Sequence, residues 1–225
     1  IQGSFSYKGK PFWIVDTAGI RRKNRVETDL EYFSVNRAIA TIAEADVVFL
    51  LIDAEEGLTD QDKKIASLIV KRGVGIILVL NKWDKLPKIE NRFQAVSDRI
   101  RYLFPILSFS PLLAISALKK EGIDKLLNTA AKVNNQLAKR IDTGKLNQSL
   151  RTWVEKHPPP TSKKGNLRLK YITQVSVKPL RFLLFVNRLQ SFPRSYLRYI
   201  ENRIRKEFDF DLVPLEIQLR LSGKR

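Results

Sequence analysis

Three short polar segments each follow a run of apolar residues, which is how side chains with chemistry are placed at the ends of buried strands. The segments are Asp16-Thr17-Ala18-Gly19, Asn81-Lys82-Trp83-Asp84 and Ser116-Ala117-Leu118. The apolar runs before them span residues 12–15, 76–80 and 112–115. Because ligands of open α/β sheets bind beyond the carboxyl ends of the strands, we expect these three segments to form one site.

The second segment has the residue types needed to recognise guanine. Guanine presents two adjacent donors, the ring N1–H and the exocyclic amine, and the Asp84 carboxylate can accept both. Adenine would present an acceptor to Asp84 instead, so the spacing predicts selection of guanine. Asn81 can bridge this loop to a phosphate-binding loop and to the base, and the Lys82 stem can cover the face of the ring. The alternative interpretation is a polar turn that caps a strand.

The first and third segments are weaker signals that gain meaning from their order. At a strand end, Asp16 can hold Mg²⁺ through water, and Gly19 lets a backbone N–H approach a γ-phosphate. An ordinary turn is the alternative for this segment. The Ala117 N–H can donate to the guanine O6. The predicted nucleotide-binding residues are therefore Asp16, Thr17, Ala18, Gly19, Asn81, Lys82, Trp83, Asp84, Ser116, Ala117 and Leu118, with Asp16 as the metal residue.

The loop that would hold the phosphates is missing from this sequence. A GTPase needs a Gly-rich loop ending in Gly-Lys-Ser or Gly-Lys-Thr, and a threonine that completes the Mg²⁺ shell. Both should precede the strand before Asp16, and only 15 residues precede Asp16 itself. The sequence also contains no methionine. We therefore expect a piece of a longer protein, with negligible hydrolysis by the piece alone.

The elements around these loops alternate between short β-branched runs and segments of helical period. Strands are expected at 12–15, 47–52, 76–80 and 112–115, and helices at 31–44, 60–72, 91–104 and 122–140. This order predicts an α/β domain over residues 1–140, with an open parallel sheet and helices on both of its faces.

The remainder, residues 141–225, has a different pattern. We expect a polar connector at 141–147, a helix at 148–156, strands at 167–177 and 182–187, a helix at 194–208 and a strand at 216–221. The run His157-Pro158-Pro159-Pro160 should end the first helix, because proline cannot continue it. The order α-β-β-α-β predicts a small antiparallel α+β domain. His157, the single histidine, is expected to be a helix-end residue without a catalytic role.

The formal net charge of +18 is concentrated in this second domain. Residues 1–140 contain 23 Lys and Arg against 16 Asp and Glu, whereas residues 141–225 contain 18 against 7. Such an excess favours a polyanionic partner, with a merely solvated basic surface as the alternative. The candidates for RNA contact are Arg181, Arg188, Arg194, Arg198, Arg203, Arg205 and Lys206. Tyr196, Tyr199 and Phe208 are expected in the core instead.

Composition excludes several classes of function. There are no cysteines, which rules out disulfide scaffolds, Cys-ligated metals and thiol catalysis. The apolar runs are far shorter than the roughly 20 residues that span a bilayer, and no basic amphipathic helix with a broad apolar face is visible. We therefore expect a cytoplasmic protein that does not bind a membrane.

Taken together, these residues resemble the Der (EngA) family of bacterial ribosome-assembly GTPases. The resemblance covers essentially the whole chain. It is carried by Asp16 to Lys23, by Asn81 to Asp84, by His157 to Pro160, and by the helix segment Arg198 to Arg205. Members of this family have two GTPase domains in tandem before a KH-like domain, so residues 1–140 correspond to the second GTPase domain and residues 141–225 to the KH-like domain.

The resemblance implies GTP and GDP binding with Mg²⁺, K⁺ assistance, hydrolysis of GTP, and a role in assembly of the large ribosomal subunit. It adds Ile20 to the nucleotide-binding residues, at the position where many GTPases place a glutamine that orients the attacking water. An isoleucine cannot hydrogen-bond water, so intrinsic hydrolysis should be slow. Arg21-Arg22-Lys23 can contact RNA phosphate or the preceding GTPase domain, or can be a solvated loop.

The second domain lacks the Gly-x-x-Gly loop with which ordinary KH domains clamp a nucleic-acid backbone. The Der family shows the same absence, so the domain can contact ribosomal RNA through its basic face, bind a protein, or pack on the GTPase domains. The alternative to a GTPase is a non-enzymatic RNA-binding or protein-interaction module on a remnant nucleotide-binding fold. A single-GTPase protein with a KH domain is disfavoured by the missing loop.

Overall fold

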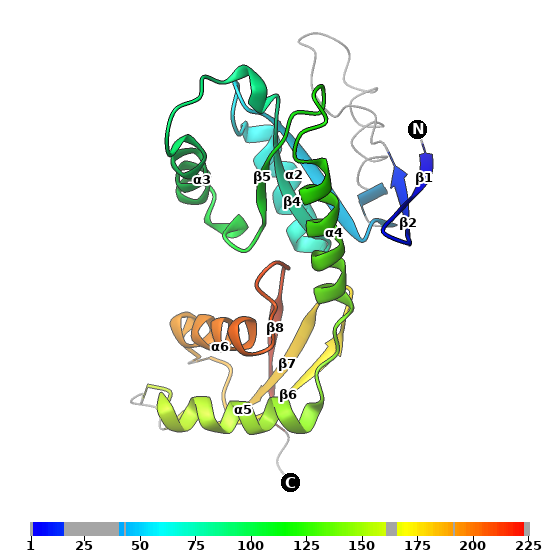
Figure 1. The fold of residues 1–225 in the computed structure, drawn as a ribbon. Helices are drawn as coiled ribbons and strands as arrows, with labels where there is room; N and C mark the ends of the chain where they lie inside the picture. The colour runs from blue at the N-terminus through cyan, green and yellow to red at the C-terminus, as the bar shows by residue number, and fades with distance from the viewer. Residues whose placement is uncertain (1, 16–40, 43, 161–165, 191, 223–225) are drawn as a thin grey trace, which may run out of the picture. The chain divides into compact units, whose positions relative to one another are not determined.

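The computed structural model describes residues 2–15, 41–42, 44–160, 166–190 and 192–222 (Figure 1). Contacts within the chain group it into two units, residues 1–131 and 132–225. This division falls inside a helix, and the predicted domain boundary at residue 140 stays a prediction. The predicted helix at 31–44 lies almost entirely outside the described residues.

The first unit is built on a parallel sheet. Its described elements are β1 (Gln2–Tyr7), β2 (Lys10–Val15), β3 (Val47–Asp53), α2 (Asp60–Arg72), β4 (Gly75–Asn81), α3 (Arg92–Leu103), β5 (Leu112–Ala114) and the start of α4 (Ile123–Ala138). The strands β3, β4 and β5 form one sheet in that order, and both neighbouring pairs are parallel. The predicted α/β class with a parallel sheet is confirmed.

Burial explains why β4 is central in this sheet. Six consecutive residues of β4, from Gly75 to Leu80, are buried, so both faces of the strand are covered. On one face, Ile76 and Leu78 belong to a cluster with Ile52 of β3 and Ile69 of α2. Burial of apolar surface on both faces is why the strand is a continuous apolar run instead of an alternating one.

One strand pairs differently from the prediction. We expected residues 12–15 to join the parallel sheet, but β2 pairs antiparallel with β1, and within the described residues it has no partner in the three-stranded sheet. The turn between them has positive φ at Lys8 (50°) and Gly9 (74°). Two-residue turns of this hand match the twist of an antiparallel hairpin. The sequence analysis overlooked this turn and the strand before it.

The second unit contains α5 (Thr143–Lys156), β6 (Leu169–Ser176), β7 (Arg181–Val186), α6 (Arg194–Glu207) and β8 (Glu216–Leu221). Its sheet has the order β6-β7-β8. We predicted an antiparallel sheet, and this is correct for β6 with β7 but wrong for β8, which is parallel to β7. The cause is α6, because a helix between two strands returns the chain to the end at which the first strand began.

The first helix of this unit begins earlier than predicted. We expected a polar connector up to residue 147, but α5 starts at Thr143, because the Asp142 side chain accepts a hydrogen bond from the Lys145 N–H at 2.9 Å. That bond satisfies one of the free N–H groups of the first turn. The helix buries Leu146, Leu150 and Trp153. It ends at Lys156, directly before His157 and the three prolines, as predicted.

Candidate functional site

Two of the three predicted loops meet at one edge of the parallel sheet. The β3–β4 register pairs Asp53 with Asn81, and the β4–β5 register pairs Leu80 with Ala114. All three strands run the same way, so the residues after Asn81 and after Ala114 leave the sheet at its carboxyl edge. The first predicted loop, Asp16 to Ile20, lies outside the described residues.

Asn81 joins the second loop to the third. Its Oδ1 accepts a hydrogen bond from the Ala117 N–H at 3.1 Å, and the Trp83 N–H donates to the Ile115 carbonyl at 3.1 Å. The Ala117 N–H was predicted to donate to guanine O6, and Asn81 was predicted to reach a phosphate loop. In this structure the two groups bind each other, and this bond ties the second loop to the third.

Asp84 is a shielded, ionised carboxylate in this edge. It lies in a single 3-10 turn, Trp83–Lys85, and only 12% of its side chain is exposed. A hydrogen bond from the Ser116 side chain lowers the pKa of Asp84 below its ordinary value, and burial opposes this shift. The Lys119 Nζ lies 4.0 Å from its Oδ2 and favours the charged form as well. The group is therefore an acceptor over the whole physiological pH range.

Ser116, in the third loop, holds the Asp84 carboxylate through its side-chain hydrogen bond. It is almost fully buried, with 1% exposed, and its Oγ accepts from the Lys119 N–H at 3.1 Å. Its backbone pairs with Glu121 in both directions. Leu118 is 86% exposed and contributes no packing.

Trp83 packs against the core of the first unit. Its ring packs edge-on against Phe93, with the centroids 6.0 Å apart, and against the core cluster of the sheet. An indole held in this way anchors the loop to the domain. Its neighbours in the sequence are thereby fixed relative to β4 and α3.

Lys82 has a left-handed backbone, with φ 62°, and its side chain is half-exposed. Its Nζ lies 2.6 Å from Oδ2 of Asp53, which raises the pKa of Lys82 and, through the same contact, lowers the pKa of Asp53. Asp53 contacts a predicted site residue and was not itself predicted from the sequence. The available signal was a carboxylate at the end of the buried run 47–52, in the same place as the other predicted site residues.

The described residues of this edge do not include a metal site. The described part of the chain contains no cluster of three or more His, Cys, Asp or Glu that would hold a metal ion. The predicted Mg²⁺ residue, Asp16, is outside that part. Among the described residues, no helix is long and apolar enough to span a bilayer.

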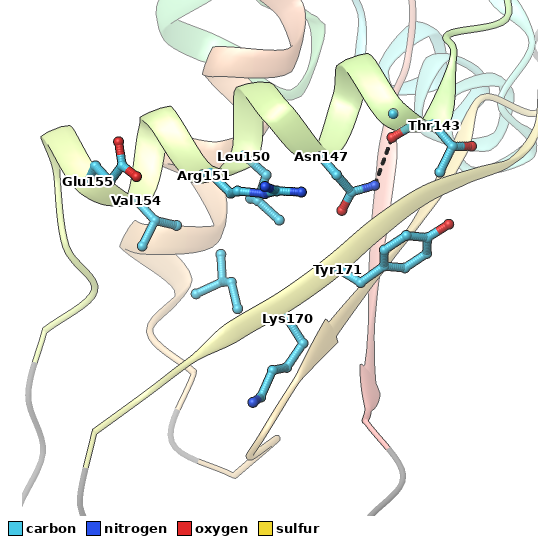
Figure 2. Close-up of a pocket in the computed structure, with 10 residues that line it drawn as sticks. Thr143, Asn147, Leu150, Arg151, Val154, Glu155, Lys170 and Tyr171 are labelled. Atoms are coloured by element: carbon cyan, nitrogen blue, oxygen red, sulfur yellow. Dashed lines mark hydrogen bonds between the residues drawn. The ribbon is translucent and has the colours of Figure 1, made fainter. Parts of the chain in front are cut away.

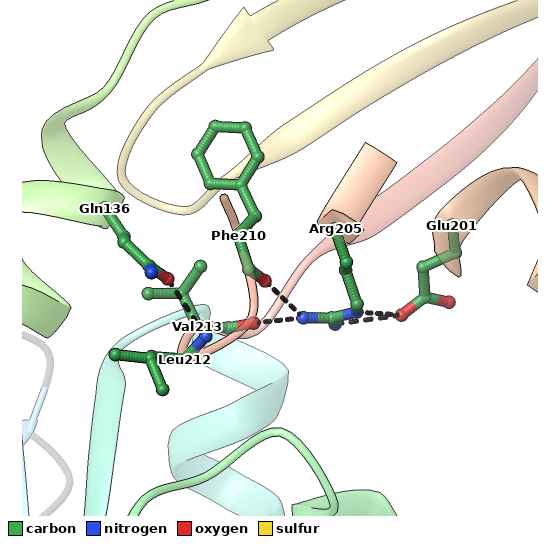
Figure 3. A network of polar contacts seen from close by, with 6 residues as sticks. All are labelled: Gln136, Glu201, Arg205, Phe210, Leu212 and Val213. Atoms are coloured by element: carbon green, nitrogen blue, oxygen red, sulfur yellow. Dashed lines mark hydrogen bonds and ion pairs between the residues drawn. The ribbon is translucent and has the colours of Figure 1, made fainter. Parts of the chain in front are cut away.

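In the second unit, the structure separates the predicted RNA-contacting residues into two groups. Arg205 is fully engaged within the chain: it donates to the carbonyls of Phe210 and Val213 at 2.9 and 2.7 Å and to Glu201 Oε1 at 3.0 and 2.9 Å (Figure 3). Arg203 pairs with Glu207, and Arg181 pairs with Glu216. The members of the other group are exposed: Arg188, Arg194, Arg198 and Lys206.

Tyr196 is buried in the core, as predicted, whereas Tyr199 and Phe208 are only half-buried. The hydroxyl of Tyr196 donates to the His157 carbonyl at 2.7 Å, and that of Tyr199 donates to the Trp153 carbonyl at 3.1 Å. Burial raises the pKa of Tyr196 to about 12. Phe208 packs edge-on against Trp153. These rings fasten α6 to α5 and are not available to stack on bases.

A groove of about 430 Å³ lies between α5 and β6, on residues that the sequence analysis did not single out (Figure 2). Leu150, Val154 and Leu169 provide its apolar lining, and Arg151 and Lys170 provide positive charge. None of the predicted RNA-contacting residues lines it.

Comparison with known proteins agrees with this geometry. A profile of the elongation factor Tu GTP-binding domain matches residues 3–136, and a profile described as the KH-domain-like C-terminal region of EngA bacterial GTPase enzymes matches residues 140–220. The chain belongs to the GTP-binding domain family, in its Der (EngA) branch. GTPase Der of Borrelia garinii is 44% identical over 98% of this chain, and GTPase Der of Treponema pallidum is 40% identical over all of it.

The chain spans about half the length of these Der relatives, 50% and 49%. Among solved structures, Era of Aquifex aeolicus bound to GDP and AlF4⁻ aligns over 99% of this chain and 81% of its own, with a TM-score of 0.51 and 21% identity. At that identity the likeness shows the fold alone. This chain and Era therefore share a fold over nearly the whole of this chain.

Proposed function

We propose that the full-length protein binds guanine nucleotides at the edge formed by β3, β4 and β5, hydrolyses GTP, and acts in ribosome assembly. The observation that carries this proposal is the pairing of Asp84 with Ser116 and of Asn81 with Ala117. Ser116 holds a shielded carboxylate, Asp84, which can accept the N1–H and the exocyclic amine of guanine, and Asn81 fixes the neighbouring Ala117 loop beside it. The relatives named GTPase Der support the enzymatic part.

In this proposal the phosphates and the metal ion are bound by residues outside the β3–β5 edge. We propose that Asp16 to Ile20 approach the γ-phosphate and Mg²⁺, with the Gly-Lys-Ser/Thr loop supplied upstream in the full-length protein. When bound, Mg²⁺ and K⁺ would neutralise charge on the transferring phosphoryl group. Among the described residues, Asp84 orients the base, Ser116 holds Asp84, and Asn81 holds the Ala117 loop. Ile20 offers no hydrogen bond to water, so the intrinsic rate should be low.

The base-recognition test is Asp84→Asn in the full-length protein. The substitution replaces an acceptor of two donors by an amide that faces the guanine amine with its own donor. We expect affinity for GDP to fall at least about tenfold, since a bidentate charge-assisted pair is lost. Affinity for xanthosine diphosphate should rise, because xanthine carries a carbonyl where guanine carries the amine. Both are measured by calorimetric titration.

Asp98→Asn is the matched control, because Asp98 is an exposed carboxylate that contacts Gln94 on α3. Its GDP affinity should equal that of the wild type. A wild-type protein that binds ADP as well as GDP, or an Asp84→Asn variant with unchanged GDP affinity, would exclude the proposed site.

We also propose that the second unit contacts ribosomal RNA through the exposed group Arg188, Arg194, Arg198 and Lys206. Within the described residues none of these four side chains has a polar partner, and all four are exposed. Arg194, Arg198 and Lys206 lie on α6, the first two positions four residues apart and the last two eight residues apart. The solved structure of Era with nucleotides 1506–1542 of 16S ribosomal RNA concerns a protein of the same fold. A protein partner remains the alternative for this surface.

Salt dependence tests this second proposal. In the full-length protein, alanine at Arg194, Arg198 and Lys206 should weaken binding to purified ribosomal RNA and should reduce the slope of log K against log salt by about two units, at roughly 0.7 to 0.9 per phosphate contact. Arg181→Ala is the control, because Arg181 is paired with Glu216. An unchanged slope in the triple variant would mean that RNA does not bind this face.

A further inference from the structure

Asp53, at the end of β3, has both carboxylate oxygens committed. Its Oδ1 accepts from the Glu55 N–H at 2.9 Å, and its Oδ2 lies 2.6 Å from the Lys82 Nζ. Only 7% of the residue is exposed, whereas about half of the Lys82 side chain is exposed. The contact therefore joins a fixed, buried anion to a lysine whose stem is accessible to a ligand.

The backbone around Asp53 is fixed to the sheet edge. The Gly57 N–H donates to the Asp53 carbonyl at 2.8 Å, in a tight turn where Gly57 has φ 75°. The Ala54 N–H donates to the Asn81 carbonyl at 3.0 Å, so this turn is also bonded to the residue that precedes Lys82. The Asp53 carboxylate is consequently held at a set distance from the base-recognition loop.

Lys82 needs such a contact more than an ordinary surface lysine does. Its left-handed backbone is uncommon for residues other than glycine, and such conformations persist only where surrounding contacts maintain them. Long lysine side chains sample many rotamers in solvent, and an ion pair at their end limits this freedom. Asp53 is the only buried carboxylate in the described residues that contacts Lys82.

We propose that Asp53 is a positioning residue for the nucleotide site: it holds the Lys82 ammonium and thereby keeps the lysine stem next to Asp84, where the stem covers the face of the bound guanine. This inference rests on the proposed function, since the stem can cover a base only if a base binds there. Asp53 itself does not touch the nucleotide.

A double-mutant cycle in the full-length protein separates this role from simple support of the fold. The variants are Asp53→Asn, which keeps the size of the side chain, Lys82→Met, which keeps an apolar stem without the ammonium, and their combination. GDP affinity is measured by titration, and the binding that is lost in Asp84→Asn identifies the site of interest. Each single variant should lose about three- to fivefold in affinity, the scale of one partly exposed ion pair. The double variant should lose no more than either single one.

Glu55→Gln is the matched control, because Glu55 lies in the same turn and pairs at 3.4 Å with Lys85 instead. Its GDP affinity should remain within about twofold of the wild type. The thermal unfolding midpoint of every variant is recorded in parallel. If Asp53→Asn does not fold, the comparison of Lys82→Met with the wild type still tests the proposal. Unchanged GDP affinity in Lys82→Met would mean that the contact between the ammonium and Asp53 does not position the stem.

The outcomes are distinct. If Asp84→Asn abolishes guanine selection but Asp53→Asn and Lys82→Met have wild-type affinity, or their losses multiply, the positioning role is wrong and the guanine site stands. If Asp84→Asn leaves guanine affinity unchanged, the proposed function is wrong, and the role of Asp53 falls with it.

Discussion

Arg205 and Arg198 are seven residues apart on one helix, and the structure predicts opposite consequences when each is replaced by alanine. Arg205 donates four hydrogen bonds, two to backbone carbonyls and two to Glu201, and only 16% of its side chain is exposed. Removing it leaves the Phe210 and Val213 carbonyls without their charged donor. Hydrogen bonds to charged groups contribute about 1.5 to 3 kcal/mol each, and the pair with Glu201 contributes less because 33% of the Glu201 side chain is exposed.

We therefore expect Arg205→Ala to lower the free energy of unfolding of the second unit by about 2 to 4 kcal/mol, whereas Arg198→Ala should change it by less than about 0.5 kcal/mol. Urea unfolding followed by tryptophan fluorescence measures this. Trp153 reports on the second unit alone in a background where Trp13 and Trp83, both in the first unit, are phenylalanine. RNA affinity should fall for Arg198→Ala. Equal stability of the two variants would refute the structural role of Arg205.

Two further predictions concern the first unit. Gly122 has φ 79°, and an added Cβ would lie 2.8 Å from the Ala114 carbonyl oxygen. Gly122→Ala should therefore lower the free energy of unfolding by about 1 to 3 kcal/mol and weaken GDP binding. An unchanged melting midpoint would contradict this. The contact with Lys82 lowers the pKa of Asp53, and the contact with Ser116 lowers the pKa of Asp84, both from 3.8. The two carboxylates therefore stabilise the fold fully above that pH, and this stabilisation is lost as the pH falls through their lower folded-state pKa values. Acid titration of unfolding should show this loss below about pH 4, reduced in Asp53→Asn, while GDP affinity stays flat between about pH 5 and 8.

The position of the proposed guanine-binding residues at the sheet edge could be predicted from the sequence because its signal is local. Asn81 to Asp84 directly follow a buried strand, and the strand places them at the sheet edge without further information. Asp53 could not be assigned a role in this way, since its partner Lys82 is 29 residues away and the contact exists only after β3 and β4 pair in register.

The same distinction explains the errors in the second unit. The helical period of α6 was visible, but the direction in which β8 pairs with β7 is decided by tertiary packing. The start of α5 at Thr143 was detectable, because Asp142 is a preferred N-cap residue, yet the polar composition of 141–147 favoured a connector. All arginines of α6 look alike in sequence, although Glu201 four residues before Arg205 was a usable sign of pairing.

The two proposed binding surfaces differ in how far their side chains are held by contacts within the chain. At the sheet edge, Asn81 is bonded to Ala117 and Asp53 is in contact with Lys82, so under the proposed function little side-chain entropy would be lost when guanine binds. On α6, Arg194 and Arg198 are exposed and must lose rotamer freedom when they bind a phosphate. Base selection should therefore tolerate salt, because it depends on fixed, shielded groups. RNA binding should depend steeply on salt, because it depends on mobile exposed charges. A single salt titration that follows both ligands would distinguish the two surfaces in one protein.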